Sequence, residues 1–150
     1  MSFWLQILGA YVATVSAGLT VEIPRALLFK VGYVGAFGYI MYLCVLPSSN
    51  VVVATLAAGI VIAGFAQLFA RYFKAPVTMF YIPGFFPLVP GIGIYRTAFY
   101  YINQQPEQAS HYFLQTLLVS GAIAVSIFLM DSLLEIFAHL HKKRKETSHG

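Results

Sequence analysis

The chain has 150 residues, of which 59% are hydrophobic and only 9% are charged, and its formal net charge is +4. A chain of this length cannot hide so much apolar surface in one water-soluble core, so the composition indicates an integral membrane protein. Cys44 is the only cysteine, which excludes an internal disulfide framework. The positive charge is explained by membrane orientation and by contact with anionic membrane lipid, and we expect no nucleic-acid partner.

Three apolar segments open the chain and predict three transmembrane helices. They cover residues 3–21, 24–46 and 51–70, and the polar stretch "PSSN" at 47–50 predicts a tight turn. At 1.5 Å per residue, each segment approaches or exceeds the roughly 30 Å thickness of the hydrocarbon layer. No basic residue precedes the first apolar run, so we expect this segment to be retained rather than cleaved as a signal peptide.

The fourth segment, residues 77–102, contains the unusual stretch "YIPGFFPLVPGIGIY" at 81–95. Each of its three prolines removes a backbone donor and costs about 3 kcal/mol in a helix interior. Backbone groups freed at membrane depth persist only where they are buried in protein or line a wet cavity, as in the discontinuous helices of many transporters. The stretch therefore predicts a broken fourth helix, with a simple kink as the alternative.

Two features after the break predict a site for an anion. Gly91 is expected to open a new half-helix, whose unpaired N–H groups and positive dipole end favour a carboxylate. Arg96 follows five residues later, and an arginine within the membrane is costly enough to indicate a function. The alternative is that Arg96 lies near the outer interface and extends to lipid phosphate.

A polar loop at 103–111 leads to a fifth apolar segment at 112–140, which is longer than one span requires and must tilt or protrude. Asp131 and Glu135 are four residues apart, so they lie on the same face of this predicted helix. Asp131 is a candidate for carrying a coupling proton, and an ion pair with a partner is an equal alternative. Other polar side chains either join helices or contact a substrate: Gln67, Gln115, Thr116 and Ser120.

The distribution of Lys and Arg predicts the orientation of the spans. With five spans, eight of the nine basic residues fall on one side, and only Arg96 is left over. Because cytoplasmic loops retain positive charge, we expect the N-terminus outside and the C-terminus inside. A four-span arrangement with a re-entrant fourth segment would export Arg71 and Lys74 against this rule. The expected fold is thus all-α, with one transmembrane domain at 1–141 and a basic cytoplasmic tail at 142–150.

Small residues recur along the apolar segments at spacings that suit close helix packing. The glycines at 32, 35 and 38 resemble a nucleotide-binding loop only superficially, since no strand precedes them. Helix packing is the better explanation for these glycines, for Gly9 with Ala13 and Ala17, and for Gly59 with Ala63 and Gly64.

The sequence contains no recognisable set of catalytic residues, so we do not expect an enzyme. No pair of intramembrane carboxylates, metal cluster or nucleophile with a nearby base can be built from them, and the four histidines fall in loops or in the tail. We therefore expect no catalytic residue, no metal and no cofactor.

The stretch "IPGFFPLVPGIGIY" resembles the proline–glycine signature of the small, YjjB-like subunit of the threonine/serine exporter family. The likeness extends to "VEIPRALLFKVGYVGAFGY", to "ARYFKAPVTMFYIPG" and to the basic tail, and so covers nearly the whole chain. In that family the small protein is similar to the C-terminal half of longer, ThrE-type exporters and works with a larger membrane subunit. The signature positions carried over as substrate-binding are Pro83, Pro87, Pro90, Gly91 and Tyr95; Arg96 joins them on physical grounds alone.

The resemblance implies a subunit of a secondary exporter in the bacterial cytoplasmic (inner) membrane. Its substrates would be small amino acids such as threonine and serine, or dicarboxylates such as succinate. The alternative function is a noncatalytic scaffold that supports the larger subunit, and further copies of the chain are another partner to consider.

Overall fold

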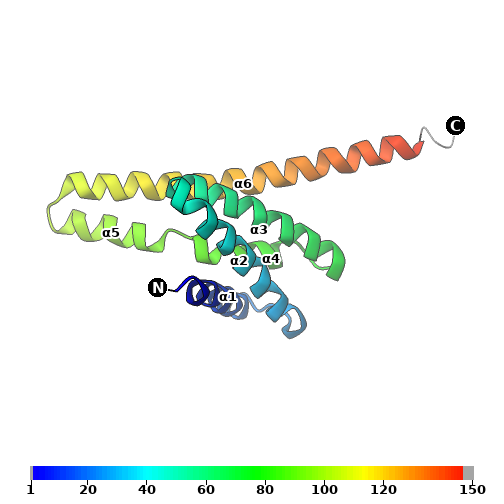
Figure 1. Ribbon diagram of the computed structural model, residues 1–150, viewed down its shortest axis with the longest axis horizontal. Helices are drawn as coiled ribbons and strands as arrows, with labels where there is room; N and C mark the ends of the chain where they lie inside the picture. Colours follow the sequence, from blue (N-terminus) through cyan, green and yellow to red (C-terminus); the bar gives the residue numbers. More distant parts are fainter. Residues whose placement is uncertain (1, 147–150) are drawn as a thin grey trace.

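The computed structural model describes the backbone of residues 2–146 and the side chains of residues 2–139, and this part of the chain is helical, without strands. Six α-helices follow in order (Figure 1): α1 Phe3–Thr20, α2 Arg25–Val45, α3 Val51–Phe73, α4 Thr78–Phe85, α5 Gly91–Ile102 and α6 Pro106–Glu146. Short 3-10 helices, η1 Leu46–Ser48 and η2 Phe86–Leu88, follow α2 and α4.

Four of these helices are long and apolar enough to cross a membrane: α1, α2 with η1, α3 and α6. The fourth predicted segment is indeed broken, because α4 with η2 and α5 are bent by 47° against each other. This bent pair adds a fifth span if it crosses as one unit. For the described residues, the prediction of an all-helical fold with apolar helices long enough to span a membrane and with an interrupted fourth segment is confirmed, and the structure is compatible with four or five spans.

The start of α6 differs from the sequence prediction. We expected a loop at 103–111, but α6 begins at Pro106 and residues 106–111 are helical. Proline fits the first turn of a helix because its missing N–H would be unpaired there, and Glu107 complements the helix dipole in that turn. Polar residues thus continue the helix beyond its apolar part. With 41 residues, α6 is about 60 Å long, roughly twice the thickness of the hydrocarbon layer.

The core of the molecule lies between α2, α3 and α4, with α1 packed on α2 and α4 and with α6 packed on α3. Its centre holds the fully buried side chains of Val31, Val34, Ile62 and Phe80. In contrast, α5 has no buried residue and packs on α6. Figure 1 shows α5 and the first part of α6 lying side by side as an antiparallel hairpin.

Glycines bring the helices of this core into close contact, as predicted. A Cβ atom added to Gly35 would overlap the side chain of Thr14 on α1, and one added to Gly38 would overlap Ile62 on α3. Gly59 on α3 is equally close to Ser126 on α6. Gly9 does not serve this purpose within the chain, because nothing lies within 4 Å of its Cβ position.

Gly35→Ala should therefore destabilise the protein by about 1–3 kcal/mol, because its methyl group overlaps Thr14 at a tight helix crossing. The same change at Gly9 meets no neighbour and should leave the melting temperature unchanged or slightly raised. Thermal melts of both variants in detergent check this, and equal melting temperatures would refute the close α1–α2 contact.

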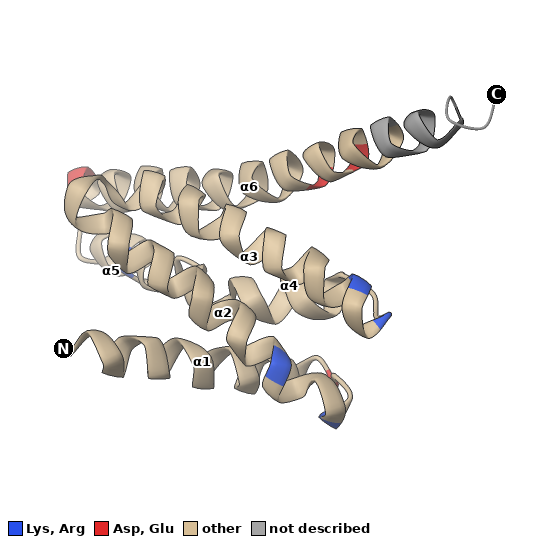
Figure 2. Cartoon of the chain, turned by 45° about the vertical axis from the view of Figure 1, so that its right-hand side comes forward, with Lys and Arg blue, Asp and Glu red and all other residues tan. Residues whose placement is uncertain are grey.

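Positive charge gathers at one end of the helices, as Figure 2 shows. We call this the basic end and define it by Arg25 and Lys30 on α2, Arg71 on α3 and Lys74 directly after α3. There Lys30 lies over the ring of Phe73, with its Nζ 3.9 Å from the ring centroid. The side chains of the basic tail at 142–145 lie outside the described residues, so their place in this pattern stays a prediction.

Candidate functional site

A cavity of about 410 Å³ lies beside the break in the fourth segment. The break contributes Pro87, Leu88, Val89 and Pro90, and α2, α3, α5 and α6 supply the remaining walls. The lining from α2 and α3 comes from residues near η1, so the cavity occupies the half of the molecule that is opposite to the basic end.

The backbone at the break explains why α5 begins where it does. Pro87 is the second residue of η2, Val89 is extended with φ −59° and ψ 125°, and Pro90 precedes the first turn of α5. The N–H of Gly91 donates to the carbonyl of Val89 at 2.8 Å. The N–H groups of Ile92 and Gly93 lie in the first turn of α5 and so have no acceptor within the helix. Among the described residues, they also donate to no backbone carbonyl before the helix. The first turn of α5 therefore presents free donors, as expected at a helix N-terminus.

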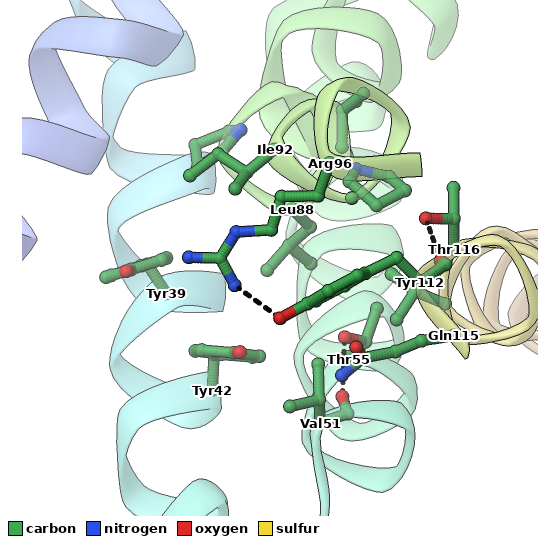
Figure 3. Close-up of a pocket in the computed structure, with 15 residues that line it drawn as sticks. Tyr39, Tyr42, Val51, Thr55, Leu88, Ile92, Arg96, Tyr112, Gln115 and Thr116 are labelled. Carbon is green, nitrogen blue, oxygen red and sulfur yellow. Dashed lines mark hydrogen bonds between the residues drawn. The ribbon is translucent and has the colours of Figure 1, made fainter. Parts of the chain in front are cut away.

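Arg96 reaches into this cavity from α5, on the same face as Ile92 and Gly93. Figure 3 shows its guanidinium group between Tyr39, Tyr42 and Tyr112. Its Nη1 donates to the hydroxyl of Tyr112 at 3.3 Å, and its Cζ lies 5.2 Å from the centroid of that ring.

The position of Arg96 depends on the α5–α6 hairpin. Tyr112 is held by stacking on Tyr100, with centroids 5.4 Å apart and planes within 3°. Gly93 allows the two helices to approach, since a side chain there would overlap Thr116. The described part of the chain forms no ion pair between Arg96 and an acidic side chain, so a positive charge faces the cavity without a carboxylate.

The remaining cavity wall combines polar groups with apolar surface. Tyr39 and Tyr42 on α2 stack on each other at 5.5 Å. The hydroxyls of Thr55 and Thr116 donate back to their own helices at 2.7 Å, which leaves their lone pairs for other donors. Gln115 adds an amide. A cavity of this size, with a few convergent polar groups among apolar ones, suits a small polar molecule.

The structure places the predicted site residues in three different settings. Pro87, Pro90 and Arg96 line the cavity. Pro83 is fully buried inside α4, in the core. Gly91 and Tyr95 share another face of α5, where Tyr95 is 67% exposed and stacks on Phe99.

Four polar side chains were predicted either to join helices or to contact a substrate. Gln115 and Thr116 line the cavity, whereas Gln67 and Ser120 do not. Sequence reasoning missed other lining residues: Tyr39, Tyr42, Thr55 and Tyr112. No spacing distinguishes these residues from the other tyrosines and threonines of the chain, since the helix arrangement alone brings them to the cavity.

Asp131, the candidate for proton coupling, lies in a separate polar cluster toward the basic end. Gln67 on α3 donates from Nε2 to Asp131 Oδ1 at 2.8 Å, and the hydroxyl of Tyr81 on α4 donates to the same oxygen. Glu135 does not take part in these hydrogen bonds. Asp131 is twelve residues beyond Val119 of the cavity wall, which is about 18 Å along α6. The described residues contain no group of His, Cys, Asp and Glu side chains that could hold a metal ion.

In a comparison with known families, residues 6–133 match the model described as "Threonine/Serine exporter, ThrE". No curated protein and no solved structure matches the chain. The match covers all the residues that line the cavity, together with Gln67, Tyr81 and Asp131. The family consists of membrane exporters, in agreement with the apolar helices and the broken fourth segment. The chain therefore belongs to the threonine/serine exporter (ThrE) family.

Proposed function

We propose that the chain is a subunit of a secondary exporter that binds small carboxylate-bearing metabolites in the cavity beside Arg96. The observation that carries this proposal is a guanidinium group that faces a cavity of about 410 Å³ without a carboxylate partner. An arginine pairs well with a carboxylate because its planar donors match both oxygens. Ile92 and Gly93, whose N–H groups lack a backbone acceptor, also line this cavity, and we propose that these N–H groups add further donors.

The family and the lining of the cavity support the proposed substrate class. Threonine and serine carry a carboxylate for Arg96 and a hydroxyl group that Thr55, Gln115 or the two tyrosines of α2 can bind. A short dicarboxylate such as succinate shares the carboxylate, and we include it in the proposal. Substrate would reach each side of the membrane in turn as the helices move around the break between α4 and α5.

A larger membrane subunit is the proposed partner. The chain alone has four or five spans, and its α5 has no buried residue. A large part of α6 is exposed as well, including Phe128, Leu133 and Phe137. These apolar faces suit contact with a partner or with lipid. The alternative function, a noncatalytic scaffold, would need the same contacts but no substrate in the cavity.

Efflux of labelled threonine, serine and succinate tests this proposal. Cells that lack both subunits should retain the substrate, and cells that produce this chain with a larger subunit of the same family should export it. Affinity purification of the chain should recover that larger subunit, and recovery of further copies alone would indicate a homo-oligomer. Export at full rate by the purified chain alone in vesicles would contradict the two-subunit arrangement, and no export of any of the three by the pair would contradict the substrate class.

We also propose that the basic end faces the cytoplasm of a bacterial cell, with the N-terminus outside and the C-terminus inside the inner membrane. Support comes from Arg25, Lys30, Arg71 and Lys74, which lie together at one end (Figure 2). A reporter fused after Gly150 should then behave as cytoplasmic. Protease cleavage of the tail from the outer face of sealed cells would refute this orientation.

A further inference from the structure

Gln67, Tyr81 and Asp131 form a closed polar cluster between three helices, within otherwise apolar surroundings. Both donors converge on one carboxylate oxygen, and Gln67 Nε2 also donates to the hydroxyl of Tyr81 at 3.1 Å. Tyr81 is buried, and Gln67 and Asp131 are half-buried. The neighbours of the cluster include the apolar side chains of Phe85 and Met130. Three side chains that are far apart in the sequence thus form hydrogen bonds with one another.

This cluster connects the first half of the broken segment to α6. The packing partners of α4 are α1, α2 and α3, whereas the hydrogen bond from Tyr81 to Asp131 ties α4 to α6. The cavity lies in the opposite half of the molecule, beyond the break. The cluster therefore lies in the basic half of the molecule, and the cavity lies in the other half.

The charge of Asp131 has no cationic partner in the described part of the chain. Arg71 on α3 and Lys74 directly after α3 lie beyond Gln67 toward the basic end, and both are exposed without an ion pair to Asp131. On α6, Glu135 and His139 are exposed beyond Asp131. On α4, Tyr81 is the titratable group that faces the carboxylate. In the described part of the chain, the groups that face the carboxylate are thus the neutral donors Gln67 and Tyr81. A carboxylate within a membrane-spanning helix that has no cationic partner is a candidate for a functional role.

The donor set favours a proton over a metal cation. Gln67 turns its amide N–H₂, and Tyr81 its hydroxyl hydrogen, toward Oδ1. Neither arrangement offers oxygen lone pairs to a metal ion beside the carboxylate. Within the described residues, Oδ2 of Asp131 receives no hydrogen bond from another side chain, and this oxygen can form a new O–H bond.

We propose that Asp131 is a proton-binding site that, with Gln67 and Tyr81, operates a gate at the basic half of the molecule; the proposal rests on the exporter function described above. With the carboxylate ionised, charge-assisted hydrogen bonds hold α4 against α3 and α6, and the gate is closed. A proton from water forms an O–H bond at Oδ2 and neutralises the carboxylate. The hydrogen bonds from Gln67 and Tyr81 then weaken, α4 separates from α6, and the gate opens. Ionisation returns the proton to water and closes the gate again.

Asp131→Asn tests the proton site in the exporter, because asparagine keeps the shape of the protonated carboxyl group but cannot titrate. In vesicles that hold the complete exporter, efflux driven by an imposed pH gradient should fall by about tenfold or more, while exchange of labelled for unlabelled substrate stays within about twofold of wild type. Glu135→Gln removes a carboxylate one turn away, outside the cluster, and should leave both rates unchanged. A response to the pH gradient that survives in Asp131→Asn, or a requirement for Na⁺ instead, would overturn the proposal.

A second measurement does not depend on transport. Hydrogen–deuterium exchange should show lower protection factors for the amides of α4 in Asp131→Asn than in wild type at neutral pH, and the two proteins should converge as the pH falls. In wild type, infrared spectra should show a protonated carboxyl band that grows over the same pH range and that is missing in Asp131→Asn but present in Glu135→Gln. Equal protection and an unchanged band in Asp131→Asn would refute the proton site.

Tyr81→Phe tests the gate independently of the proton site, because it removes one hydrogen-bond donor and keeps the carboxylate of Asp131. It should lower the protection of α4 at neutral pH while the infrared band persists. Unchanged protection in Tyr81→Phe would refute the tie between α4 and α6. If the wild-type complex moves none of the three substrates, the proposed function fails, and the exchange and infrared measurements still decide the proton site.

Discussion

Arg96→Gln should weaken the binding of a carboxylate substrate by about ten- to a hundredfold, because a hydrogen bond to a charged group contributes about 1.5–3 kcal/mol. Glutamine retains a donor of similar reach but loses the charge and the planar pair of N–H groups. The loss should appear in the concentration of substrate that gives half-maximal transport.

The thermal stability of Arg96→Gln should be unchanged although substrate binding is weaker. Arg96 is exposed, and its hydrogen bond to Tyr112 is long at 3.3 Å, so we expect the melting temperature of the solubilised complex to stay the same. Arg96→Lys keeps the charge without the planar donors and should fall between the wild type and Arg96→Gln.

Arg71→Gln is the matched control for this change. Arg71 is an exposed arginine on α3 at the basic end, and it does not line the cavity. Its replacement should leave substrate affinity unchanged. If Arg96→Gln also transports like wild type, then Arg96 extends to lipid phosphate rather than to substrate, and the scaffold function becomes the better explanation for the chain.

A continuous fourth helix should abolish transport while the protein stays folded. The variant Pro87→Ala, Pro90→Leu and Gly91→Ala removes the residues that interrupt the backbone between η2 and α5. Each proline costs about 3 kcal/mol in a helix interior, so a straight helix over residues 78–102 gains stability locally. The N–H groups of Ile92 and Gly93 would then donate to carbonyls of the preceding turn.

The loss of the break removes the anion site in two ways. The free donors at the start of α5 disappear, and straightening the bend of 47° moves Arg96 away from Tyr112 and the cavity. We expect export at background level together with a melting temperature that is equal to or higher than that of wild type. Pro83 stays unchanged in this variant because it is buried in the core.

Pro76→Ala is the control for removing a proline near the same segment. Pro76 is exposed, lies between α3 and α4, and is distant from the cavity lining. Efflux assays paired with thermal melts distinguish the outcomes. Normal export by the continuous-helix variant would show that the prolines produce a packing kink and nothing more.

Much of the architecture could be predicted from the sequence because it depends on local physical chemistry. Apolar runs of the right length predict membrane helices, and the prolines at 87 and 90 predict an interruption, since they cannot donate the backbone hydrogen bonds of a helix. The helix that follows does begin at Gly91, and Arg96 does belong to it. The polarity of residues 103–111 predicts a loop, but α6 begins at Pro106, and Pro106 and Glu107 are typical of a first helical turn.

Only the tertiary structure decided which side chains meet. Which face of each helix turns inward depends on packing with the others, and an almost uniformly apolar helix carries little signal for it. Tyr39 and Tyr42 reach Arg96 only because α2 crosses beside the break. Asp131 and Gln67 were recognisable as polar groups within apolar helices, but Tyr81 joined them only when α3, α4 and α6 came together. Helix formation depends on neighbours in the chain, whereas a binding site depends on neighbours in space.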